Sequence, residues 1–103
     1  MNEILLYKII WKKVAICCAI ENRDVYVVNK KFNIEGNKVC YIDDNKNIKL
    51  YINREELYSR LKSDGFKITE QINKEDKTIN AKFSITRERI LSIANNNKEK
   101  KIK

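Results

Sequence analysis

The sequence predicts an α+β fold, in which an antiparallel β-meander and a β-hairpin form a sheet and two helices pack on one face of it. Apolar residues alternate with a period of two over much of the chain, polar segments separate the alternating runs, and the period becomes helical in two places. The chain has 103 residues, 43% of them hydrophobic, which is the size and apolar content of one folded domain. We expect a single domain over residues 1–97 and a basic, disordered tail over residues 98–103.

The N-terminal segment is the most apolar part of the chain, and we interpret it as strands. In residues 4–10 apolar side chains occur at alternate positions, which favours a strand, but they also have helical spacing, so a helix remains an open alternative. Residues 14–20 combine β-branched and small side chains and are expected to form a central strand. Polar residues 21–24 then precede an apolar run over 25–28, a pattern typical of a hairpin.

The meander continues through two further turns. Gly36-Asn37 separates the alternating runs 32–34 and 39–42, and Gly at the first central position predicts a type II′ turn. A third turn over residues 43–47 leads into an alternating strand over 48–52.

The period changes to that of a helix at residue 54. Asn53 followed by Glu56 resembles a capping box, and Gly65 stands where a left-handed residue ends many helices. We therefore predict a helix over residues 54–64.

A second hairpin and a last helix follow. Alternating residues 66–72 and 79–85 flank a polar turn over 73–78, and Thr86 can cap a C-terminal helix. The buried side of that helix is expected to carry Ile90, Leu91, Ile93 and Ala94.

These patterns predict one core in a monomeric protein. Alternating or helical spacing assigns to that core Val14, Ile16, Ile42, Ile48, Leu50, Leu57, Leu61, Ile79, Phe83 and Leu91.

Charge and cysteine usage favour a cytoplasmic protein. The net charge is +8, and half of that excess lies in the last 18 residues. Lys8, Lys12 and Lys13 interrupt the apolar N-terminal segment, so we expect neither a membrane span nor a signal peptide there. Cys17, Cys18 and Cys40 have no zinc-binding spacing and no histidine beside them, and a reducing compartment is the simplest setting for them, although a disulfide to Cys40 stays open.

The sequence predicts no enzyme, no cofactor and no metal site. The chain contains no histidine, the side chain that titrates nearest to neutral pH. Asp64 with Glu75-Asp76-Lys77 resembles the ligand pattern of metal-dependent nucleases, but residues 75–77 fall in a polar turn, where a solvated charge run is expected.

Binding candidates are aromatic and basic residues. Because Tyr51 and Lys49 alternate with core positions, we expect a partner-binding sheet face formed by Tyr26, Tyr41, Lys49 and Tyr51. A nucleic acid would be contacted instead by Arg87, Arg89, Lys98, Lys100, Lys101 and Lys103.

Two functions follow as hypotheses. The first is a small non-catalytic protein that inhibits or regulates a protein partner, with a nucleic-acid-handling host defence ribonucleoprotein as a candidate, as anti-CRISPR-like inhibitors of phages and plasmids do. The abundance of Lys, Ile and Asn suits an AT-rich mobile element. The alternative is a small nucleic-acid-binding regulator that uses a Lys/Tyr sheet face and the basic tail, and in the first hypothesis nucleic acid remains a secondary ligand.

Overall fold

The chain folds into a five-stranded antiparallel sheet with three helices, which confirms the α+β class. The computed structural model describes residues 2–42 and 49–102. Its elements are α1 (Asn2–Ile20), β1 (Val25–Glu35), β2 (Lys38–Ile42), β3 (Lys49–Ile52), α2 (Arg54–Asp64), β4 (Lys67–Asn73), β5 (Thr78–Thr86) and α3 (Arg87–Ile102).

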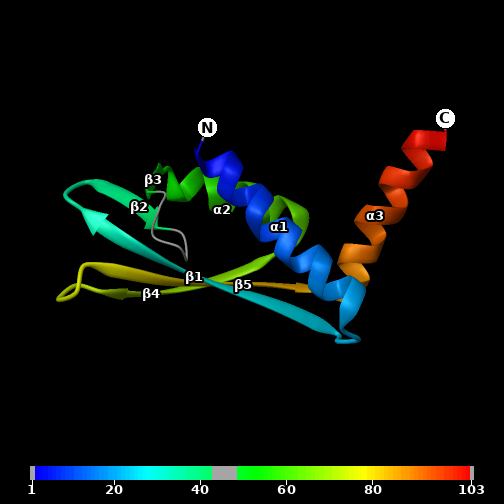
Figure 1. Ribbon diagram of the computed structural model, residues 1–103, viewed down its shortest axis with the longest axis horizontal. Helices are drawn as coiled ribbons and strands as arrows, with labels where there is room; N and C mark the ends of the chain where they lie inside the picture. The colour runs from blue at the N-terminus through cyan, green and yellow to red at the C-terminus, as the bar shows by residue number, and fades with distance from the viewer. Residues whose placement is uncertain (1, 43–48, 103) are drawn as a thin grey trace.

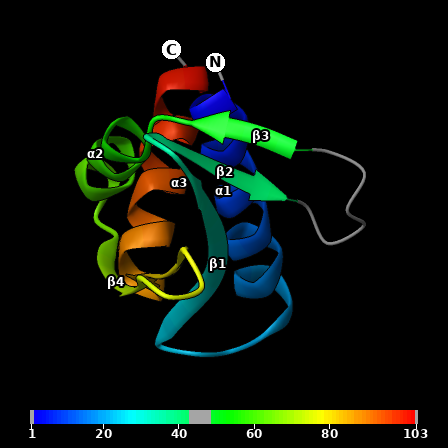
Figure 2. The ribbon, with the colours of Figure 1, turned by 90° about the vertical axis from the view of Figure 1, so that its left-hand side faces the viewer.

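The strands are ordered β3-β2-β1-β5-β4, so that β1 lies at the centre. Helices α1 and α2 cover one face of the sheet, while α3 leaves the end of β5 and extends away from it (Figures 1 and 2). The register pairs Val28 with Phe83 and Phe32 with Tyr41, and all four side chains are buried on the covered face. The core therefore lies between this face and the two helices.

The N-terminal strands that the sequence predicts are wrong, because residues 2–20 form the single helix α1. Leu6, Ile10 and Val14 are spaced by four, lie on one side of that helix and are fully buried. The remaining sides carry apolar residues as well, so the helical period is blurred and alternate positions look like a strand. The helical alternative for residues 4–10 is the correct one.

Strand β1 is continuous over 11 residues and follows α1 directly after residues 21–24. Residues 21–24 therefore join α1 to β1 and do not form a hairpin. The turn at Gly36-Asn37 is confirmed: Glu35 pairs with Lys38, Gly36 has a φ of 64°, and Asn37 does not share this positive φ, as a type II′ turn requires. The third turn, predicted over 43–47, lies outside the described residues.

The elements between residues 53 and 86, and the start of α3, agree with the sequence. Helix α2 spans Arg54–Asp64, the Asn53 side chain accepts a hydrogen bond from the Glu56 N–H at 3.1 Å, and Gly65 has a φ of 111°. Strands β4 and β5 form the expected hairpin. Thr86 caps α3 through its hydroxyl, which accepts from the Arg89 N–H at 3.2 Å.

The predicted core is correct in part. Val14, Leu57, Leu61, Ile79 and Phe83 are buried, and Leu50 is half-buried. Three of the predicted residues are exposed, each because its element presents that position to the outside: Ile16, Ile42 and Leu91. Ile48 lies outside the described residues.

Helix α3 packs on the body less than expected. Ile90 is buried, but Leu91 and Ala94 are exposed and Ile93 is half-buried, because the helix diverges from the sheet (Figure 1). Its backbone stays helical to Ile102, where a disordered tail was expected from residue 98. Within the described ranges no helix is both long and apolar enough to cross a membrane.

Candidate functional site

The structure divides the predicted tyrosine face between the two sides of the sheet. Tyr26 and Tyr41 lie on the face that the helices cover, and both are buried. Tyr51 and Lys49 lie on the opposite, open face and are exposed, as alternation predicts for them. The four residues therefore do not form one surface.

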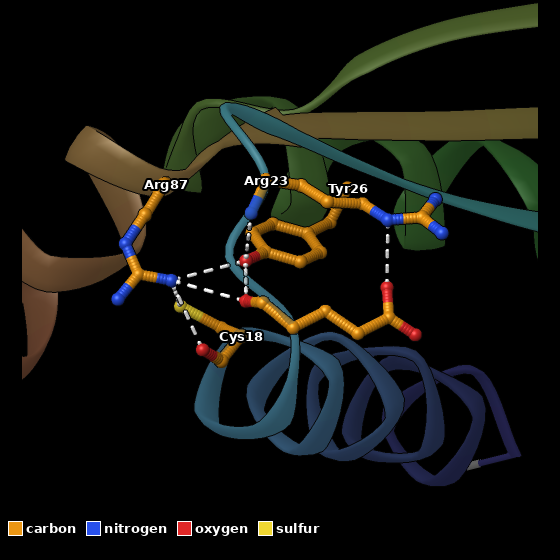
Figure 3. Close-up of polar contacts among 5 residues, drawn as sticks. Cys18, Arg23, Tyr26 and Arg87 are labelled. Atoms are coloured by element: carbon orange, nitrogen blue, oxygen red, sulfur yellow. Dashed lines mark hydrogen bonds and ion pairs between the residues drawn. The ribbon is translucent and has the colours of Figure 1, made fainter.

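Tyr26 belongs to a polar network that joins the end of α1 to the start of α3 (Figure 3). Its hydroxyl donates to the backbone carbonyl of Glu21 and accepts from the Arg23 N–H at 3.1 Å. The Arg87 guanidinium points into the same network and donates to the Tyr26 hydroxyl at 3.0 Å.

Arg87 caps a helix other than its own. Its Nη1 donates to the carbonyl oxygens of Cys18 at 3.0 Å and Glu21 at 3.3 Å, at the C-terminal end of α1. The last turn of α1 contains no basic residue, so Arg87 supplies the positive charge that the negative end of the helix dipole attracts. This use of Nη1 assigns Arg87 a structural role.

Arg89 does the same for α2. Its Nε donates at 2.8 Å to the carbonyl oxygen of Asp64, the last residue of that helix. Since Arg87 and Arg89 are two positions apart in α3, they point in different directions and reach different helices. The two arginines that were nucleic-acid candidates are thus tied to helix ends.

A polar cluster surrounds Tyr51 on the open face. Its hydroxyl donates to Glu35 at 3.2 Å, and the ammonium groups of Lys38 and Lys49 each lie 5.4 Å from its ring centroid. Glu35 also pairs with Lys49, and that ion pair lowers the pKa of Glu35 and raises the pKa of Lys49. Because both lysines already contact the ring, Tyr51 is a poor platform for stacking a base.

Tyr41 is also engaged. Its hydroxyl accepts from Lys30 Nζ at 3.3 Å, and the same ammonium lies 5.3 Å from the ring centroid. The ring packs edge-on against Phe32.

The basic tail is described only as backbone. Lys98, Lys100 and Lys101 fall within α3, and Lys103 lies outside the described residues. Their role in nucleic-acid binding stays a prediction.

The outer side of α1 is the surface that the sequence analysis missed. Leu5, Ile9, Ile16 and Ile20 are exposed at 45%, 36%, 48% and 78%, respectively. At 3.6 residues per turn they fall within about 60° of the helix circumference, so they form one stripe. Their spacing of four, seven and four was the available signal, but it becomes visible only once the segment is known to be a helix. We call these four residues the α1 stripe.

The cysteines and acids of the described residues form no group of three or more that could hold a metal ion. Cys17 is half-buried, Cys18 and Cys40 are buried, and all three are free thiols.

Comparison with known proteins gives no relative: no family model, no curated protein and no solved structure matches the chain.

Proposed function

We propose that this chain is a small non-catalytic binding protein that inhibits or regulates a protein partner, and that it contacts this partner through the α1 stripe. The observation that supports the proposal is the second apolar side of α1, which the sheet leaves uncovered. A helix that packs on a sheet needs one apolar side, and polar residues would be the ordinary choice on the other.

The stripe is large enough to matter energetically. From Leu5 to Ile20 it extends about 22 Å along the helix at 1.5 Å per residue. Burying its side chains would contribute about 25 cal/mol for each Å² of apolar surface removed from water. Several large apolar side chains exposed along one side of a helix can mark an interaction site or an aggregation hazard.

Charge indicates the kind of partner. On the helix circumference Lys12 and Lys13 flank the stripe on its two sides, Lys8 lies beyond Lys12, and all three are exposed. A second copy docked stripe to stripe would bring these lysines against their own counterparts, which is unfavourable. A different protein with an apolar surface and an acidic rim fits the stripe better.

For the identity of the partner we propose a nucleic-acid-handling complex of host defence. The support for this step is the composition, rich in Lys, Ile and Asn, together with the small size of the chain. Blocking such a complex requires only tight binding and no chemistry of the inhibitor's own.

The test compares three tagged proteins in the native host: the wild type, Ile9→Glu/Ile16→Glu, and Ile72→Glu. Ile72 is also an exposed isoleucine, at 51%, but it lies on the edge strand β4 and serves as the matched control. A partner recovered after nuclease treatment is then purified and titrated with each protein by calorimetry. We expect wild type and Ile72→Glu to bind equally and the α1 variant to lose at least tenfold in affinity. Equal binding by all three, with circular dichroism showing all three folded, contradicts the proposal.

A second candidate function, nucleic-acid binding, is favoured by one observation on the open face of the sheet. Glu35 is the single acid among the described strand residues on that face. The register brings one lysine from each of the five strands to it: Lys31, Lys38, Lys49, Lys67 and Lys82. A basic face of this kind can contact phosphates without base readout.

This candidate has its own measurement. Anisotropy of a labelled single-stranded oligonucleotide is followed over a range of salt concentrations with wild type and with Lys67→Ala/Lys82→Ala. If the open face binds phosphates, the slope of log K against log salt falls by about 0.7 for each contact removed. No binding at physiological salt excludes this function.

A further inference from the structure

Within the part of the chain that the structure describes, other strands cover only half of one edge of β1. This strand pairs with β5 from Val25 to Asn33, but with β2 only from Phe32 to Glu35. Among the described strands, residues 25–31 of β1 therefore have a neighbour on the β5 side alone. This part of β1 is its N-terminal half, which runs on beyond β2 (Figure 1).

The hairpin turn determines which backbone groups face that open edge. In a two-residue hairpin the residues that flank the turn form a hydrogen-bonded pair, here Glu35 and Lys38. Backbone groups of successive residues point to opposite sides of an antiparallel strand, so those of every second residue point to the same side. Counting back from Glu35 by twos, the N–H and C=O groups of Val27 and Asn29 point toward the side where β2 has ended.

A hollow runs along this edge. It has a volume of about 430 Å³ and is lined by Lys13 of α1, residues 27–31 of β1, and Tyr41 and Ile42 of β2. Three of these residues are lysines, Lys13, Lys30 and Lys31, and none of them is acidic. Lys13 and Lys31 are exposed, and Lys30 is half-buried beside the Tyr41 hydroxyl.

We propose that this edge binds an extended acidic segment of a partner protein, which adds to the sheet as a further strand beside residues 25–31. Alternating donors and acceptors along a strand edge are the pattern that another peptide backbone satisfies. The lysines then select acidic side chains, Lys31 on the open face and Lys13 and Lys30 on the covered side. A nucleic acid would match the lysines but would leave the backbone carbonyls of the edge without donors along a phosphate chain.

The inference deepens the proposed function, because it also requires a protein partner. It involves a different surface from the α1 stripe, however. Its test uses synthetic peptides and the full chain, so that failure of the α1 proposal leaves the outcome unchanged. The variant Ile9→Glu/Ile16→Glu should bind the peptides as the wild type does.

The probe is a capped peptide that repeats Glu-Glu-Thr and is long enough to span residues 25–31, so that Glu side chains lie on both faces of the added strand. It is titrated into the isotope-labelled full chain, and amide shifts and hydrogen exchange are recorded by NMR. We expect shift changes concentrated in residues 25–31 and slower exchange at Val27 and Asn29. Two control peptides separate charge from strand pairing. One replaces each Glu by Lys and tests the contribution of charge. The other is N-methylated at alternate positions, so it lacks the N–H donors of one edge, and tests the contribution of backbone hydrogen bonds.

Variants of the chain complete the design. Lys30→Glu/Lys31→Glu reverses two charges at the edge and should weaken binding of the acidic peptide by about tenfold or more. Lys62→Glu/Lys67→Glu makes the same change in charge on α2 and β4 and should bind as the wild type does. The proposal is overturned if the acidic peptide does not bind, if its shifts fall outside β1 and its immediate neighbours, or if the N-methylated peptide binds equally well.

Discussion

The side chain of Arg89 lies directly over Gly65, at the point where α2 ends. A Cβ added to Gly65 would stand 2.9 Å from Arg89 Cγ and 3.0 Å from its Nε. Gly65 also has a φ of 111°, which side chains disfavour. The absence of a side chain at Gly65 therefore allows both the left-handed turn and the path of Arg89, which passes over Gly65 to reach the Asp64 carbonyl.

We expect Gly65→Ala to destabilise the protein through both effects. The left-handed backbone conformation costs about 1–2 kcal/mol for a residue with a Cβ, and displacement of Arg89 adds the loss of its hydrogen bond. Urea denaturation of the wild type, Gly65→Ala, Arg89→Ala and the double variant measures the coupling between the two residues. Strictly additive free energies of unfolding would show that Arg89 and Gly65 do not depend on one another.

Arg87 has the equivalent role at the end of α1. Its removal should lower the free energy of unfolding by more than the removal of an exposed surface arginine does. In Arg87→Met the carbonyls of Cys18 and Glu21 lose a charged donor and the half-buried network around Tyr26 loses its cation, so we expect a loss of about 1.5–3 kcal/mol.

The control for Arg87→Met is Arg60→Met. Arg60 forms an exposed ion pair with Glu56 one helical turn away, at 3.6 Å, and such pairs contribute about 0.3–0.5 kcal/mol. Thermal unfolding of both variants gives the comparison. Equal losses would mean that Arg87 is an ordinary surface arginine.

The part of the fold that was predicted correctly is the part in which local signals and burial agree. Helix α2 has a side-chain cap at Asn53, a left-handed Gly65 at its end, and two buried leucines on one side. The β4–β5 hairpin has alternation on β5 and a polar turn before it. Each of these elements could be identified without knowing what it packs against.

Helix α1 could not be identified in this way. It carries apolar residues on two sides: Leu6, Ile10 and Val14 face the sheet, and the α1 stripe, flanked by lysines, faces outward. With apolar residues on two sides, neither period dominates, and only the tertiary arrangement decides between helix and strand. The candidate site was missed for the same reason, since the stripe exists only on a helix.

The polar contacts of the predicted site residues were equally inaccessible. Alternation places Tyr51 and Lys49 outside the core, and the structure agrees. That Arg87 would reach back 69 positions to Cys18 depends on how α1 lies on the sheet, which no local pattern contains.

Because the N-terminal segment is a helix, alanine substitutions at Val14 and Ile16, two positions apart within it, should change stability by different amounts. Val14→Ala should cost about 0.5–2 kcal/mol because Val14 is fully buried, whereas Ile16→Ala removes an exposed side chain and should change stability by less than about 0.5 kcal/mol. If the segment were a strand, positions 14 and 16 would share a face and behave alike. Urea midpoints of the two variants decide the matter, with Leu61→Ala, expected to lose about 2–5 kcal/mol, as a core reference.

Two tyrosines should make the protein sensitive to alkaline pH. Burial, and then the carboxylate of Glu70 to which its hydroxyl donates at 2.6 Å, raise the pKa of Tyr58 well above its ordinary value of 10.0. Burial, and then the hydrogen bond to Asp64, raise the pKa of Tyr7 as well. Both groups keep their protons in the folded state at a pH where the unfolded chain has lost them.

The sign follows from proton binding. Above about pH 10 the folded state binds more protons than the unfolded state, so the free energy of unfolding falls as the pH rises, while below that pH the contribution is fully present. Tyr58→Phe removes the larger of the two effects. We expect this variant to be less stable than the wild type at about pH 8, because it lacks the hydrogen bond to Glu70, but to lose less stability between about pH 8 and 11. Urea denaturation at both pH values gives the four free energies, and Tyr7→Phe should show the same behaviour with a smaller amplitude. An identical alkaline loss in the wild type and in Tyr58→Phe would mean that the Tyr58–Glu70 contact does not hold the proton of the tyrosine, since lysines titrate in both proteins alike.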